Sequence, residues 1–100
     1  MGLKMSNKKD EVVTLLHAAY EEVKDTDNDF AKMLLEAYQK IQKGENYKII
    51  CAKIALPCNH YVLAHLKNIP KNVGKLNTLV QEIRKQYLMM EDIALGPFWG

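Results

Sequence analysis

Five side chains in this sequence have the chemistry of catalytic or metal-binding residues, namely Cys51, Cys58, His17, His60 and His65. Cys51, Cys58 and His65 follow one another at intervals of seven residues. In a helix that interval is a rise of about 10.5 Å, whereas zinc ligands lie within about 2.3 Å of the ion. Within one helix the three cannot share a metal, and the same separation excludes a disulfide. We therefore expect no metal site, and we expect both cysteines to be small core residues.

His65 carries the one catalytic alternative. Ala64–Lys67 loosely resembles the phosphoacceptor segment of histidine phosphotransfer domains, which are also four-helix bundles of this size. In those domains one residue and then Leu-Lys-Gly and small residues follow the histidine. Here one position is missing, and Asn68–Pro70 stands where the small residues belong. The other interpretation of His65, and of His17, is a core or boundary histidine with its hydrogen bonds satisfied.

No other pattern predicts catalysis. The sequence has no Gly-rich phosphate loop, no nucleophile elbow and no paired-carboxylate constellation. Glu21 and Glu22 are adjacent in the chain, as are Glu91 and Asp92, so each pair points to different sides of a helix and is typical of solvated charge. We expect a protein that is not an enzyme and that needs no cofactor.

A run of regularly spaced cations lies in the second half of the chain. Lys67, Lys71 and Lys75 are spaced at four residues, and Arg84 and Lys85 follow. They indicate either a solvated face or a modest basic patch for an acidic partner or an anionic lipid surface. The formal net charge is only +2, weaker than is usual for a dedicated nucleic-acid binder. A regulatory module that uses these cations stays an alternative, but we expect no nucleic acid as partner.

Length and composition indicate one soluble, helical domain. One hundred residues leave no room for a second core, and 48% of them are hydrophobic against 26% charged. Three prolines and five glycines are few, which favours an all-α fold. No apolar run approaches the roughly 20 residues of a membrane span, and two cysteines are fewer than a small secreted domain usually carries. We expect a cytoplasmic protein, with residues 1–6 disordered or derived from an expression vector.

Four amphipathic stripes follow one another along the chain, each with the 3.6-residue period of a helix. The breaks between them hold capping residues: the cluster Asp25–Asp29, then Lys43–Gly44 with Asn46, then Asn68–Asn72. Short breaks between amphipathic helices predict an antiparallel four-helix bundle. The predicted stripes run over Val12–Val23, Phe30–Ile41, Tyr47–Leu66, which includes His65, and Leu76–Met90.

Two prolines determine the expected shape of the third helix and the expected end of the fourth. Pro57 lies inside the third stripe, where a proline removes one backbone hydrogen bond. Because the apolar phase is the same on both sides, we expect one kinked helix, with two short helices joined at Pro57 as the alternative. Gly96–Pro97 is predicted to end the fourth helix and to leave residues 96–100 as a short aromatic tail. Phe98 and Trp99 then either pack back on the bundle or bind a partner.

The layout of the chain resembles the immunity proteins of class II, pediocin-like bacteriocins. The resemblance rests on a basic N-terminus, two ordinary amphipathic helices, a longer third helix that includes Tyr47–Ala55, and a final helix that includes Leu76–Arg84. It covers the whole chain as a layout. Pro57 and the shortness of the tail depart from the pattern of the family.

This resemblance implies a non-enzymatic function, in which the protein protects a Gram-positive producer cell against its own bacteriocin. It implies a partner in the membrane, a mannose-type phosphotransferase permease approached from the cytoplasmic side, and so a place partly at the inner membrane face. It also implies that roughly Asn68–Gly100 governs which bacteriocin is resisted. Together with the aromatic and basic side chains, it nominates six partner-binding residues: Lys71, Lys75, Arg84, Tyr87, Phe98 and Trp99. Which bacteriocin and which oligomeric state apply are left open.

Overall fold

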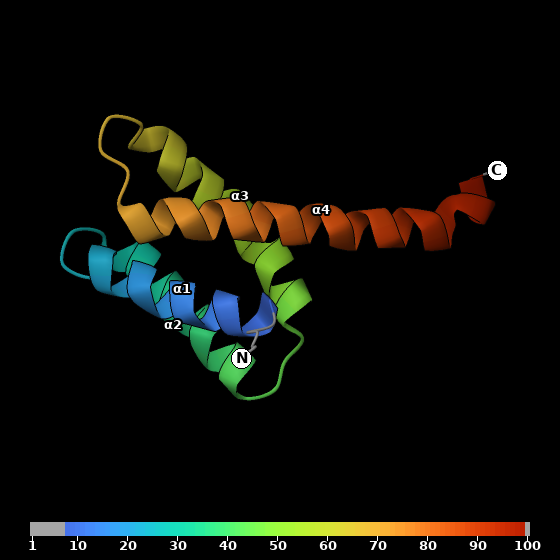
Figure 1. Ribbon diagram of the computed structural model, residues 1–100, viewed down its shortest axis with the longest axis horizontal. Helices are drawn as coiled ribbons and strands as arrows, with labels where there is room; N and C mark the ends of the chain where they lie inside the picture. The colour runs from blue at the N-terminus through green and yellow to red at the C-terminus, as the bar shows by residue number, and fades with distance from the viewer. Residues whose placement is uncertain (1–7, 100) are drawn as a thin grey trace, which may run out of the picture.

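The computed structural model describes the backbone of residues 8–99 and the side chains of residues 8–88. This part of the chain folds into four helices and contains no strand: α1 (Lys8–Val23), α2 (Asn28–Gln42), α3 (Tyr47–Ala64) and α4 (Lys71–Trp99). Short loops join them, and α4 is much the longest (Figure 1). The predicted four-helix bundle is confirmed.

The helices enclose one apolar core. α1 packs against α2 and α4, and α3 packs against α4, whereas α2 and α3 are less closely packed. The predicted stripes supply most of the core, so the helical period correctly identified the buried faces. The largest side chains that are fully buried in this core are Leu16, Leu34, Ile41, Leu76, Val12, Val23, Val73, Val80, Cys51 and Cys58.

The end of the third stripe was predicted wrongly. His65 and Leu66 are exposed rather than buried, because α3 ends at Ala64 and both residues lie in the following turn. Helical spacing places a residue on the buried face only while the helix continues. The apolar period was therefore followed two residues too far.

Capping residues fix the start of α2 and α3 as their sequence types predict. The carboxylate of Asp27 accepts the N–H of Phe30 at 3.0 Å, and the amide oxygen of Asn46 accepts the N–H of Lys48 at 2.9 Å. After α2 the chain turns at Gly44, whose φ of 101° lies in the left-handed region that glycine adopts without steric cost. Local chemistry thus sets these helix boundaries.

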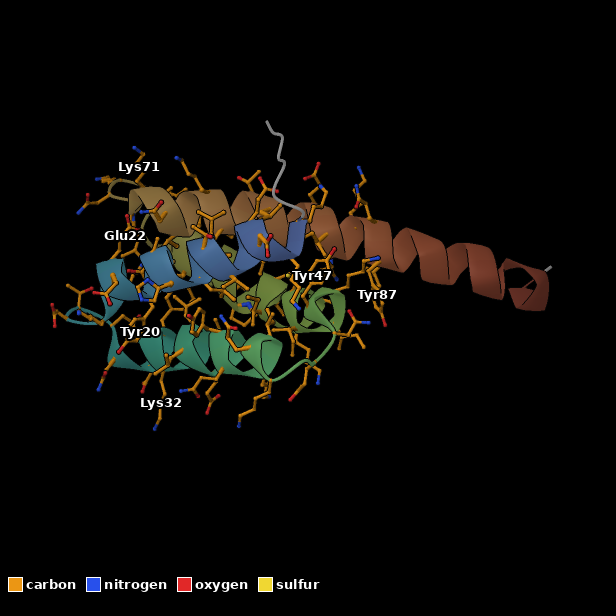
Figure 2. The ribbon with its side chains drawn as sticks, turned by 60° about the horizontal axis from the view of Figure 1, so that its bottom comes forward. Tyr20, Glu22, Lys32, Tyr47, Lys71 and Tyr87 are labelled. Carbon is orange, nitrogen blue, oxygen red and sulfur yellow. The ribbon has the colours of Figure 1, made fainter. Side chains whose placement is uncertain are left out.

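A carboxylate from α1 caps α4, against the expectation that Glu22 is merely solvated. Its Oε1 accepts the backbone N–H groups of Asn72 and Val73 at 2.9 and 3.1 Å, and its Oε2 accepts the Asn72 side-chain amide at 2.9 Å. Figure 2 shows Glu22 beside the start of α4. Glu22 fills the role of an N-cap from a distance of fifty residues, which neighbouring residues in the sequence could not reveal. Glu21 is exposed, as expected, and pairs with Lys24 at 2.7 Å.

Pro57 lies inside α3, which is one helix and not two. Close to the proline, the Nε2 of Gln81 in α4 donates to the carbonyl oxygen of Ala55 at 2.6 Å and to Oδ1 of Asn77 at 3.0 Å. A side chain of α4 thereby holds the middle of α3. The predicted kink at Pro57 stays a prediction.

The predicted end of α4 was wrong. The helix passes through Gly96 and Pro97 and ends at Trp99, so no non-helical aromatic tail is present over these residues. One proline removes a single hydrogen bond without ending a helix whose other residues stay helical, as Pro57 also demonstrates. Twenty-nine residues make α4 about 43 Å long, and its C-terminal part extends well beyond the other three helices (Figure 1).

Within the described residues, no helix combines the length and the apolar composition that crossing a membrane requires.

Candidate functional site

The predicted cations do not form one patch. Lys71 and Lys75 are exposed and lie one turn apart at the start of α4. Arg84 is also exposed, but it follows Lys75 by nine residues, which is two and a half helical turns. Lys75 and Arg84 therefore lie on opposite sides of α4, and a single partner surface cannot use both in the same way.

Two of the predicted residues lie near other helices. Lys75 lines an open groove of about 320 Å³ together with Asp10 and Glu11 of α1. Tyr87 is half-buried and shares a small hollow of about 40 Å³ with Tyr47 and Lys48 at the start of α3. In Figure 2 the Tyr47 and Tyr87 side chains lie at the same end of the bundle. The side chains of Phe98 and Trp99 lie outside the described residues.

An open groove of about 530 Å³ lies between α2 and α3. One wall is the start of α2 with Asp27, Asp29 and Phe30, and the other is the second half of α3. Three of its lining residues carry stacked rings. The Phe30 and Tyr61 rings stack with centroids 4.2 Å apart and planes inclined by 10°, and the Tyr61 and His65 rings stack at 4.0 Å and 19°.

Backbone geometry places these rings. Phe30 lies in the first turn of α2, three residues after the N-cap Asp27. Tyr61 and His65 are four residues apart and lie on the same side of α3 at its end. The Nδ1 of His65 lies 2.8 Å from the carbonyl oxygen of Tyr61 and donates a hydrogen bond to it. Sequence reasoning listed these residues as core stripes and missed the stack, because the contact of Phe30 with Tyr61 depends on how α2 and α3 pack.

The surroundings of His65 speak against a phosphoacceptor. The imidazole is exposed, but one face lies against Tyr61, and Nδ1 is engaged by a carbonyl oxygen. The residue caps the C-terminus of α3 and is not within a helix. Aromatic neighbours thus replace the small residues that leave space beside a phosphorylated histidine.

Negative charge surrounds the phenol of Tyr61. Burial raises the pKa of Tyr61, and the carboxylates of Asp27 and Glu22 raise it further, whereas a hydrogen bond with Thr26 acts in the opposite direction. Asp27, Glu22 and Tyr61 also line a second hollow of about 350 Å³ at the same end of the bundle. The phenol therefore stays neutral at physiological pH and offers a polar atom at the rim of an apolar groove.

The groove continues along α2 and α3. Met33 and Pro57 border both the large hollow and a neighbouring one of about 200 Å³, which reaches Ala37, Ile50 and Ile54. This opening follows from the looser packing of α2 on α3. The arrangement can bind an elongated apolar segment, but it brings together no nucleophile, base and oxyanion donors.

The two cysteines are core residues, as predicted. Cys51 and Cys58 are free thiols with no exposed area. Burial raises the pKa of each thiol to about 12, so neither is a reactive thiolate at neutral pH. Among the described residues, no group of three or more His, Cys, Asp or Glu side chains could hold a metal ion.

Comparison with known proteins identifies the family. No curated protein and no solved structure matches the chain. Residues 7–86 match the model of the bacteriocin immunity protein family. The match includes α1, α2, α3 and the part of α4 that packs in the bundle, which is well over half of the chain. The chain therefore belongs to the bacteriocin immunity protein family.

Proposed function

We propose that this protein protects the cell that makes it by binding, from the cytoplasmic side, the membrane receptor that the bacteriocin attacks. The family is non-enzymatic. Protection by such a protein is then a matter of binding, and the bound partner is either the bacteriocin or the receptor machinery. The observation that carries this proposal is the family match over residues 7–86.

We propose a mannose-type phosphotransferase permease as the receptor, as the resemblance to the pediocin-like immunity proteins implies. The described surface offers a long apolar groove rimmed by Tyr61 and Asp29, which suits a helical or extended segment of another protein. It offers no catalytic arrangement that would compete with a binding function.

The partner contacts are proposed to include the C-terminal part of α4. This part of the backbone projects beyond the bundle and follows the end of the family match at residue 86 (Figure 1). It contains Tyr87, Phe98 and Trp99, and aromatic side chains often dominate binding energy. Lys71 lies at the other end of α4, 16 residues before Tyr87 and 28 before Trp99, so it would have to bind a separate part of the receptor.

The test is survival. The full chain, a chain ending at Leu95 and a chain ending at Leu88 would be expressed in a bacteriocin-sensitive Gram-positive host and challenged with a panel of class II bacteriocins. Both shortened chains keep every core residue that the structure describes, the last of which is Ile83. Circular dichroism of the purified proteins controls for folding. We expect selective survival with the full chain, and reduced survival with the chain ending at Leu88.

The receptor is tested separately by co-purification. A tagged full chain would be isolated from membranes of the same host, with and without bacteriocin, and from a strain that lacks the permease. Recovery of permease subunits only from the strain that contains them supports this partner. Survival without any such recovery would retain immunity and reject the permease as the partner.

A further inference from the structure

The outward face of α3 is apolar. Three large side chains on it, Ile49, Leu56 and Leu63, are 38%, 61% and 56% exposed. They are spaced at seven residues, so they lie along one side of the helix over about 21 Å. Leu66 lies in the turn that follows α3 and is 65% exposed. We name these four residues the leucine crest.

The crest is not a by-product of general surface hydrophobicity. Among the described residues, the large hydrophobic side chains with substantial exposure are the four crest residues, Ile69 and Leu88. All but Leu88 therefore belong to α3 and the loop that follows it. The opposite side of α3 carries Cys51, Ile54 and Cys58 in the core. A helix that is apolar on both sides is normally covered on both, yet α3 packs mainly against α4 and, more loosely, against α2, and the side that carries Ile49, Leu56 and Leu63 is left exposed.

Charge is segregated in the same part of the chain. Asn46–Gln81 contains five lysines and no Asp or Glu, whereas all twelve acidic residues lie elsewhere. Lys53 follows Ile49 by four residues and precedes Leu56 by three, so it borders the crest, and Lys67 is adjacent to Leu66. Both lysines are exposed. One carboxylate, Glu36 of α2, faces the groove beside Lys53, together with Lys40.

Exposed apolar side chains flanked by lysines fit a lipid surface better than a protein partner. Contact residues that dominate protein interfaces are enriched in Trp, Tyr and Arg, and leucine is under-represented among them. The crest carries only Leu and Ile, without an aromatic or acidic side chain. Helices that lie in the plane of a membrane surface bury a row of apolar side chains between acyl chains and keep lysines at the level of anionic headgroups. In Figure 1 the loop after α3 turns back to the start of α4. Residues 65–69 of this loop are exposed, so the crest ends in an exposed loop.

We infer that the leucine crest, with Lys53 and Lys67, docks this protein on an anionic lipid bilayer. The inference deepens the proposed function and rests on it for the choice of membrane, because the crest would hold the protein at the inner face where the receptor lies. It assigns the outward face of α3 to lipid and leaves the groove between α2 and α3, together with α4, to the receptor.

Vesicle flotation with the purified full chain tests the inference. The vesicles would contain phosphatidylglycerol and phosphatidylcholine, or phosphatidylcholine alone. We expect binding to the anionic vesicles that weakens as salt rises, and at least about tenfold weaker binding to the neutral ones. Leu56→Gln/Leu63→Gln should lower the affinity for anionic vesicles by at least about tenfold, because two apolar side chains no longer enter the bilayer.

Matched variants control for non-specific effects. Leu88→Gln removes an exposed leucine outside α3, and Lys9→Gln/Lys32→Gln removes two exposed lysines from α1 and α2. Both should bind within about twofold of the unchanged protein, whereas Lys53→Gln/Lys67→Gln should bind anionic vesicles several-fold more weakly. Circular dichroism and thermal melting verify that each variant is folded.

Three results would overturn the inference: no vesicle binding, equal binding to neutral and anionic vesicles, or an unchanged affinity of the crest variant. The survival assay separates this failure from failure of the proposed function. Survival without vesicle binding retains immunity and rejects the lipid surface. Vesicle binding that depends on the crest, without survival, supports the lipid surface and rejects immunity.

Discussion

The carboxylate of Glu22 lies at the N-terminus of α4, where it accepts the backbone N–H of Asn72 at 2.9 Å and the Asn72 side-chain amide, also at 2.9 Å. The first N–H groups of a helix have no partner within the helix, and a negative charge is favoured there. One residue of α1 thus provides the hydrogen-bond acceptors for the first backbone N–H groups of α4.

Glu22→Ala should destabilise the protein by about 1–3 kcal/mol, because it leaves partly buried N–H donors of α4 unsatisfied. For a domain of this size that corresponds to a lower melting temperature by roughly 4–8 °C for each kcal/mol. The matched control is Glu21→Ala. It removes exposed ion pairs with Lys24 and His17, which solvent screens, so it should lower the stability much less than Glu22→Ala does. Equal losses in the two variants would contradict the capping role.

The buried thiols predict an alkaline limit to stability. Burial raises the pKa of Cys51 and Cys58 to about 12, above the ordinary value of 9.0. The folded protein therefore binds these protons more tightly than the unfolded chain, and the resulting stability is fully present below about pH 9. It should be lost as the pH rises from about 9 to 12. Urea denaturation across this range measures the loss, and Cys51→Ala/Cys58→Ala should have a flatter profile.

The same thiols should resist modification. At pH 8 a thiol-specific reagent should label neither Cys51 nor Cys58 in the folded protein within the time that labels both completely in urea. The reason is that neither side chain has exposed area and neither is a thiolate at that pH. Mass spectrometry of the intact protein counts the labels. Rapid labelling in the absence of denaturant would show that α3 opens easily.

Gln81 should hold α3 on α4 close to Pro57. Its Nε2 donates to the carbonyl oxygen of Ala55 at 2.6 Å, in a partly buried position. Gln81→Leu removes that donor and should lower the free energy of unfolding by about 1 kcal/mol. Gln86→Leu alters an exposed glutamine of the same helix and should change it by less than about 0.5 kcal/mol. Similar values for the two variants would show that this contact contributes nothing.

Local patterns predicted much of this fold, for a physical reason. The period that buries Leu16 and Val23, or Leu34 and Ile41, depends only on the geometry of one helix. The caps at Asp27 and Asn46 depend on bonds across two or three residues. Each of these features is contained within a single stretch of chain, so the sequence predicts it without knowledge of the other helices.

The remaining features depend on contacts between helices. Glu22 reaches α4 across fifty residues, and Phe30 stacks on Tyr61 only because α2 lies against α3. The sequence did not predict the leucine crest, because both sides of α3 are apolar. The stripe that contains Cys51 and Cys58 already accounts for the buried side of the helix, and its period does not show that the other side is also apolar.

Two glycines should respond to alanine in opposite ways. Gly44 has a φ of 101°, which an alanine adopts only with strain, so Gly44→Ala should destabilise the protein by about 1 kcal/mol although no atom lies near the added methyl group. Gly74 lies inside α4, and a methyl group there would meet Cγ2 of Ile69 at 3.4 Å, an ordinary contact. Gly74→Ala should stabilise the helix by up to about 1 kcal/mol, since alanine loses less conformational entropy on folding. Thermal and urea unfolding of both variants measure the difference. Loss of stability in both variants would mean that steric crowding of the added methyl group, and not backbone conformation, determines the effect of the substitution at Gly74.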